Sequence, residues 1–156
     1  MAETLGSLVD KLSIKCIREH YLNKSLTQKK TKFSKADLKK KLVILKKQKS
    51  LLSREIDQFV YQACAGKITL RDDKLKIYNN PEDIGRIGKI DTIGQAINGL
   101  AAKNLELWQL EDEARRQDVD LSYIGGIKHK IDKANQQRND FIDKIDELLE
   151  KLANSD

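Results

Sequence analysis

The sequence predicts an all-α fold in which two similar antiparallel αα-hairpins form a four-helix bundle, with a small β-hairpin between them. Composition favours long helices, because only one proline and eight glycines occur among the 156 residues. The chain is also internally similar: residues 4–12 align with 92–100, and residues 38–60 align with 127–149. We therefore expect a single domain, 1–156, with repeat one at 4–62, a connection at 66–90 and repeat two at 91–153.

The similarity of the two halves is best explained by duplication. Identical residues occupy aligned positions, as in the pairs Gly6/Gly94 and Asp57/Asp146, and most apolar positions remain apolar. Two unrelated amphipathic helices placed in register would also match at some apolar positions. Duplication is the interpretation that we favour.

The first hairpin is expected to contain helices over about 4–23 and from Ser34 onward. Ser34 followed by Asp37 is an acidic variant of the capping box, and Phe33 and Leu38 are spaced as a hydrophobic staple. Apolar residues at three/four spacing predict the buried stripe of each helix. The first stripe is Leu5, Leu8, Leu12 and Cys16, and the second is Leu38, Leu42, Leu45, Lys49, Leu52, Ile56 and Phe59.

The second hairpin is predicted in the same way. Thr92 with Gln95 predicts a capped helix that ends near Gln117, and Ser122 predicts the cap of a helix that ends near Ala153. The buried stripe of this last helix is Ile124, Ile127, Ile131, Ala134, Arg138, Phe141, Ile145, Leu148 and Leu152.

The connection between the repeats has a different pattern. Residues 67–78 alternate between apolar and polar on either side of Asp72 and Asp73, which predicts the small β-hairpin. The segment Asn80-Pro81-Glu82 then predicts a short helical turn.

Charge is distributed unevenly along the chain. The net charge is +6, yet residues 24–54 contain twelve Lys and Arg against one acid, whereas residues 103–156 contain nine against thirteen. Such a basic helix can bind polyanions or an anionic membrane surface. A solvated helix face is the interpretation that we favour, because the only aromatic residue in the segment is Phe33, and nucleic-acid binding is not expected. The polyanion face would comprise Lys39, Lys40, Lys46 and Lys47.

Several classes of site are not indicated. Cys16 and Cys64 lie far apart in the sequence, and His20 and His129 are isolated, so we expect neither a metal site, nor a disulfide, nor a cofactor. No apolar run is long enough for a transmembrane segment, and the first residues lack the pattern of a signal peptide, so a cytoplasmic location is expected.

Two cations interrupt the apolar stripes at equivalent positions, Lys49 in the first repeat and Arg138 in the second. A buried cation requires a partner, so an anionic or strongly polar group is expected beside each. Antiparallel pairing of the second hairpin places Asn104 level with Arg138, and the two side chains lean toward each other.

Polar residues around Arg138 form a candidate constellation on the two helices of the second hairpin. They are either a structural network that fixes helix register, which we slightly favour, or a ligand site. Trp108, opposite the small Ala134, is a core residue under the structural interpretation. The constellation is Asn104, Trp108, Glu111, Asp112, Arg115, Lys128, Asp132, Asn135, Arg138, Asn139 and Asp140.

The spacing of these residues resembles that of an uncharacterised bacterial helical family, a domain of unknown function. The matching pattern is Asn-x3-Trp-x2-Glu-Asp-x2-Arg from residue 104, followed by Lys-x3-Asp-x2-Asn-x2-Arg-Asn-Asp from residue 128. The first repeat opens like the family's motif but continues into Cys16 and His20. The resemblance implies a cytoplasmic bacterial protein, often encoded near surface-polysaccharide genes, with no established reaction.

The function that we expect is a non-catalytic accessory protein that binds a partner protein or an anionic small molecule in such a pathway. The alternative is a metal-dependent nucleotide pyrophosphatase-like enzyme that uses Glu111, Asp112, Asp140 and Asp143. Glu111 and Asp140 are expected to lie about 20 Å apart, at ~1.5 Å per helical residue. A homo-oligomer is the arrangement that would bring these carboxylates together.

Overall fold

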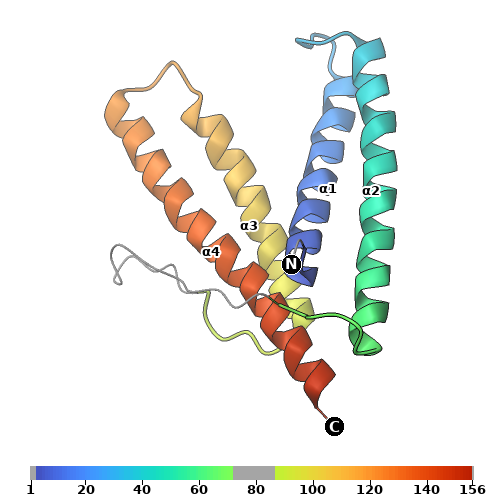
Figure 1. Cartoon of the computed structure of the whole chain (residues 1–156). Helices are drawn as coiled ribbons and strands as arrows, with labels where there is room; N and C mark the ends of the chain where they lie inside the picture. The colour runs from blue at the N-terminus through green and yellow to red at the C-terminus, as the bar shows by residue number, and fades with distance from the viewer. Residues whose placement is uncertain (1–2, 72–86, 156) are drawn as a thin grey trace.

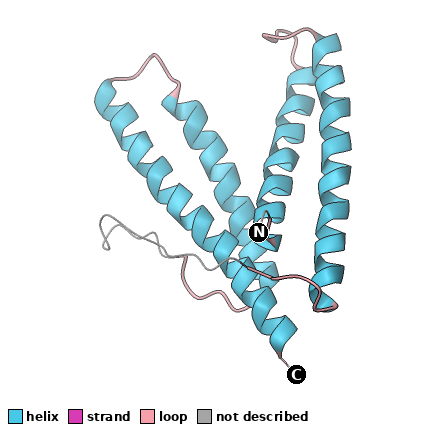
Figure 2. Ribbon diagram, in the orientation of Figure 1, coloured by secondary structure: helices cyan, strands magenta, loops and turns pink. Residues whose placement is uncertain are grey.

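The computed structural model describes residues 3–71 and 87–155, and every regular element in this part of the chain is a helix (Figure 2). The predicted all-α class is confirmed. The helices are α1 (Leu5–Thr27), α2 (Lys35–Cys64), α3 (Ile93–Ala114) and α4 (Leu121–Asn154). None of the described helices is both long enough and apolar enough to cross a membrane.

The helices form two hairpins that diverge from one end of the molecule. Helix α1 packs along α2, and α3 packs along α4. Helix α1 also packs against both α3 and α4 and provides nearly all of the packing between the hairpins. In Figure 1 the hairpins meet where α1 begins and α4 ends, and they separate toward the loops at residues 28–34 and 115–120. Helix α2 therefore lies on the outside of the fold.

Side-chain caps fix where α1, α2 and α3 begin, and those of α2 and α3 are the caps that the sequence predicts. Thr4 and Thr92 each accept a hydrogen bond from the backbone three residues on, and Gln95 completes the predicted capping box at α3. At α2 the Ser34 hydroxyl accepts from the Asp37 backbone N–H at 3.1 Å. The second hydrogen bond is not that of a capping box, because the Ser34 hydroxyl, rather than the Ser34 backbone N–H, donates to the Asp37 carboxylate.

Some predicted helix boundaries are wrong. Helix α4 is capped by Asp120, which accepts from the backbone N–H of Tyr123 at 2.8 Å, and not by Ser122. Helix α3 ends at Ala114 rather than near residue 117. In the turn that follows, the Arg116 side chain donates a hydrogen bond to the Asp118 carboxylate. Helix α1 continues four residues beyond its predicted end, to Thr27.

The predicted β-hairpin is not supported. Its described part, residues 67–71, is irregular, and residues 72–78 lie outside the described residues, as does the turn predicted at 80–82. Ile68 and Leu70 pack against the apolar core from this loop. Within residues 68–71 the apolar side chains thus contact the core, whereas Thr69 and Arg71 are exposed.

The core lies at the closed end of the molecule. Its buried members come from all four helices and include Leu5, Ala63, Ala96, Leu100, Phe141, Ile145 and Leu149. Away from this end the predicted stripes stay buried at Leu38, Leu45, Ile127, Ile131 and Ala134, whereas two of their other members are exposed. Cys16 is exposed and Leu152, in the last turn of α4, is 64% exposed, so both were wrongly predicted as buried.

Close approach of α1 to α4 joins the two hairpins. The Gly6 N–H donates to the buried Asp146 carboxylate at 2.7 Å. A Cβ atom on Gly6 would lie 2.3 Å from the Ile142 carbonyl oxygen, so only glycine fits this contact. The aligned residues of the other repeat do not make this contact, because Gly94 has no atom near its Cβ position and Asp57 is exposed. The duplication itself stays a prediction.

Alanine substitution at the two aligned glycines is expected to give opposite results. Gly6→Ala places a methyl group against backbone and should lower the free energy of unfolding by about 1–3 kcal/mol. Gly94→Ala occupies the same position in the first turn of its helix but meets open space, so it should leave stability unchanged or raise it by up to about 1 kcal/mol. Urea denaturation followed by circular dichroism measures both. Equal effects of the two substitutions would show that the α1–α4 approach is not a tight contact.

Candidate functional site

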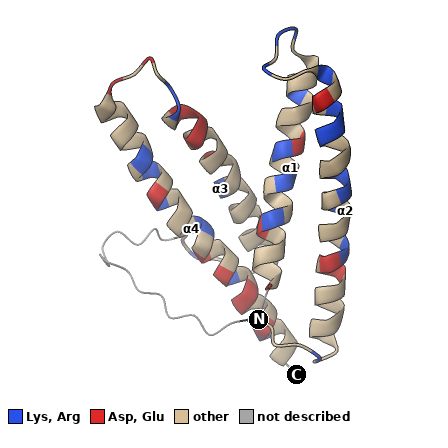
Figure 3. Ribbon diagram, turned by 45° about the horizontal axis from the view of Figure 1, so that its top comes forward, with Lys and Arg blue, Asp and Glu red and all other residues tan. Residues whose placement is uncertain are grey.

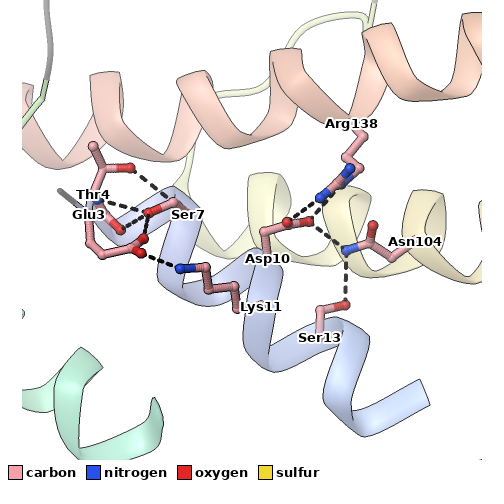
Figure 4. Close-up of polar contacts among 8 residues, drawn as sticks. All are labelled: Glu3, Thr4, Ser7, Asp10, Lys11, Ser13, Asn104 and Arg138. Carbon is pink, nitrogen blue, oxygen red and sulfur yellow. Dashed lines mark hydrogen bonds and ion pairs between the residues drawn. The ribbon is translucent and has the colours of Figure 1, made fainter. Parts of the chain in front are cut away.

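A polar network is buried where α1 meets α3 and α4 (Figure 4). The Asp10 carboxylate on α1 is the centre of this network, and Asp10 as a whole residue is only 5% exposed. One carboxylate oxygen accepts from Arg138 Nε at 2.9 Å and from Asn104 Nδ2 at 2.9 Å, and the other accepts from Arg138 Nη2. Asn104 also lies 3.4 Å from the Ser13 hydroxyl. The network thus connects three helices through one carboxylate.

The predicted proximity of Asn104 and Arg138 is confirmed, although Asp10 bridges them. Asp10 is the anion that Arg138 was expected to require, and hydrogen bonding to it raises the pKa of Arg138. Asp10 was not predicted, because apolar periodicity does not single out a polar residue on α1. A signal exists, since Gly6, Asp10 and Ser13 recur at helical spacing and form a small, polar face on α1.

The other cation on a predicted stripe is also paired. Lys49 on α2 forms an ion pair with Glu19 on α1, and both side chains are largely buried. Hydrogen bonding to Glu19 raises the pKa of Lys49. The expectation of an anionic partner is confirmed in both repeats, and in each case α1 supplies the carboxylate.

A cavity of about 290 Å³ lies beside the Asp10 network. Helix α1 contributes Ile14 and Arg18 to its lining, and α3 contributes Leu107. The cavity brings together seven of the eleven residues of the predicted constellation, which are Asn104, Trp108, Glu111, Asp112, Arg115, Asn135 and Arg138.

Four residues of the predicted constellation do not line this cavity. Lys128, Asp132 and Asn139 are exposed on α4, and Asp140 is half-buried there. Helical geometry explains the separation, because residues one position from Arg138 project about 100° away from it around the helix. Their spacing along the sequence therefore does not bring them to the same site.

Arg18 lines the cavity as an exposed cation and was not predicted as part of the site. It makes no hydrogen bond or ion pair with the residues that the structure describes, whereas Arg138 is bound to Asp10 and Arg115 lies 3.3 Å from Asp112. An exposed arginine on α1 is not recognisable as part of a site from sequence alone, because the cavity forms only when the second hairpin packs on α1.

Trp108 lies between this cavity and a second one. Its ring stacks on Tyr21 of α1, with ring centroids 5.2 Å apart and an angle of 16° between the planes. Trp108 is half-buried and lines both cavities, as Arg18 does. The second cavity, of about 380 Å³, lies between α1 and α2 and is lined mainly by apolar surface. The Trp108 side chain therefore lines two cavities and also packs against Tyr21.

The carboxylates of the enzyme alternative are not collected in one place. Glu111 and Asp112 line the polar cavity, whereas Asp140 and Asp143 do not. Within residues 3–71 and 87–155, no group of three or more His, Cys, Asp or Glu side chains has the arrangement of a metal site.

The lysines of the predicted polyanion face are all exposed. Lys39, Lys40, Lys46 and Lys47 lie outside the buried stripe of Leu38 and Leu45, and none of them lines either cavity. Figure 3 shows basic residues along α2 and acidic ones grouped on α3 and α4. Polyanion binding through this face stays a prediction.

Removal of the central carboxylate is expected to destabilise the fold. Asp10→Asn leaves the Arg138 guanidinium without an anionic partner and should cost about 1–3 kcal/mol of unfolding free energy, since part of Arg138 still reaches water. Asp132→Asn, on the exposed side of α4, is the matched control and should have little effect. The double variant Asp10→Asn/Arg138→Met should lose less stability than the two single variants together, as urea denaturation can measure. Additive losses would exclude a direct coupling.

Comparison with known proteins finds one family model that is similar to part of the second half of the chain. Residues 95–155 match the family model described as "Protein of unknown function (DUF4254)". This segment contains every residue of the predicted constellation but neither Asp10 nor Arg18. No curated protein and no solved structure matches the chain. The expected resemblance to a family of unknown function is thus confirmed for α4 and most of α3.

Proposed function

We propose that the protein is a non-catalytic accessory protein that binds a phosphate-bearing small molecule in the polar cavity between α1, α3 and α4. The observation that carries this proposal is Arg18, an arginine without a partner among the described residues, at a cavity that also contains amide and aromatic groups. The planar guanidinium donates paired hydrogen bonds to phosphate oxygens, so an unpaired arginine facing a cavity favours such a ligand.

Neighbouring groups supply the other contacts that such a ligand requires. Asn135 provides an amide, and Arg138 Nη1 makes no hydrogen bond with the described residues, because Asp10 accepts from the other nitrogens. The Asp10 network holds Arg138 in place before a ligand arrives, which lowers the entropic cost of binding. The proposed phosphate site therefore consists of one arginine held by Asp10 and one exposed arginine without a partner among the described residues.

A nucleotide sugar is one phosphate-bearing molecule whose other groups match the rest of this lining. Glu111 and Asp112 line the cavity and accept hydrogen bonds from sugar hydroxyl groups, and Trp108 provides an aromatic edge for a base. This chemistry agrees with a place in a bacterial surface-polysaccharide pathway, as the family resemblance implies. We propose that role on the resemblance and the cavity together.

Thermal denaturation with a ligand panel tests the proposal. Pyrophosphate and several nucleotide sugars should raise the Tm of the wild-type protein, because a ligand at 100 times its Kd adds about 2.7 kcal/mol to stability. Arg18→Gln should abolish the shift. Arg54→Gln removes an exposed arginine of α2 that lines neither cavity, so it should preserve the shift.

Two results would contradict the proposal. The first is the absence of a shift with every member of the panel, and the second is a shift of equal size in Arg18→Gln. A shift that requires Mg²⁺ would instead favour the pyrophosphatase-like alternative.

A further inference from the structure

We infer that the ligand is an anionic amphiphile, a phosphate monoester of a long-chain alcohol, whose phosphate binds at Arg18 and whose chain lies in the second, apolar cavity. This inference rests on the proposed function and specifies its ligand class. It is carried by the two cavities, which adjoin each other and differ in chemistry.

The second cavity has the lining that an apolar chain requires. Leu22, Phe33, Leu38, Ile44 and Leu45 line it, together with the ring of Tyr21. Its volume of about 380 Å³ is more than twice the ~150 Å³ of an apolar cavity that holds benzene. Ile44 is 57% exposed and Phe33 is 50% exposed, so a bound chain would remove a large apolar surface from water.

The two cavities meet at a cation and an aromatic ring. Arg18 and Trp108 line both of them, so Arg18 is the cation at the end of the apolar cavity that adjoins the polar one. The other cation of the apolar cavity, Lys41, lies over the Phe33 ring, with Nζ 4.2 Å from the ring centroid. Along α1 its lining extends from Arg18 to Ser25, which is about 10 Å at ~1.5 Å per residue. An anionic group bound at Arg18 would place an attached chain at the entrance to this cavity.

The dimensions distinguish a single chain from a partner helix. An α-helix with its side chains is about 10–12 Å across, which is too wide for a cavity of about 380 Å³ that extends only about 10 Å along α1. A flexible chain fits this space. A partner helix, in contrast, would leave Arg18 without the anion that its position favours.

Fluorescence of Trp108 provides a direct test, because it is the only tryptophan of the chain and lines both cavities. Decyl phosphate, below the concentration at which it forms micelles, should change the fluorescence with a Kd at least about tenfold lower than that of inorganic phosphate, since each buried methylene favours binding. Decanol, which has the chain without the charge, should bind more weakly than decyl phosphate.

Matched variants distinguish the contribution of the apolar chain to binding from that of the phosphate. Ile44→Gln, in the apolar cavity, should weaken decyl phosphate binding severalfold and leave the response to pyrophosphate unchanged. Val43→Gln is the control, because Val43 is 68% exposed, is adjacent in sequence and does not line the cavity. Arg18→Gln should weaken the binding of both phosphate compounds.

The outcomes also separate this inference from the proposed function. Pyrophosphate binding that depends on Arg18, with decyl phosphate no tighter than inorganic phosphate, would overturn the inference and leave the proposed function intact. Equal effects of Ile44→Gln and Val43→Gln would overturn it in the same way. Decanol binding as tightly as decyl phosphate, with no response to pyrophosphate, would contradict both.

Discussion

Contact between α1 and α4 is the constraint on which the rest of the structure depends. The absence of a side chain at Gly6 lets the two backbones approach closely. The Gly6 N–H, which has no backbone acceptor within the helix, donates to the Asp146 carboxylate. One turn farther along α1, Asp10 binds Arg138 and Asn104. Together these polar contacts fix both the distance and the register between the two hairpins.

Because α1 alone provides nearly all of the packing between the hairpins, they converge at one end and separate at the other. The apolar core fills the converging end, where all four helices contribute. Toward the other end α1 has α2 on one side and α3 on the other, and cavities form on both sides of it. The divergence of the two hairpins from the shared core therefore also creates the candidate site.

The two cavities differ in the charges that line them, and this difference also arises from the position of α1 between them. Helix α1 uses its acidic residues to neutralise cations of its neighbours, as Glu19 does for Lys49 and Asp10 does for Arg138. Its own Arg18 has no such partner among the described residues. A cation thus lies where the polar lining of α3 and α4 meets the apolar lining of α1 and α2. This arrangement favours a ligand with one charged end.

The sequence by itself determined the helices and the need for buried ion pairs. Local signals were sufficient for these features, because the caps at Ser34 and Thr92 depend on hydrogen bonds within one turn, and apolar spacing identifies the helical faces that contribute to the core. A cation on an apolar stripe likewise predicts an anionic partner beside it. Seven residues of the second hairpin reach one cavity because a short loop forces α3 and α4 to be antiparallel.

Only the tertiary structure decided which residues of the first hairpin take part. Asp10, Arg18 and Tyr21 belong to the site because the second hairpin packs on α1, and the polar contacts that fix this packing leave no trace in apolar periodicity. The exposure of Cys16 has the same origin, since a stripe is buried only where other helices cover it. Helix formation depends on near neighbours in the sequence, whereas the placement of one hairpin on the other depends on the space left by a single glycine and on contacts between residues more than ninety positions apart.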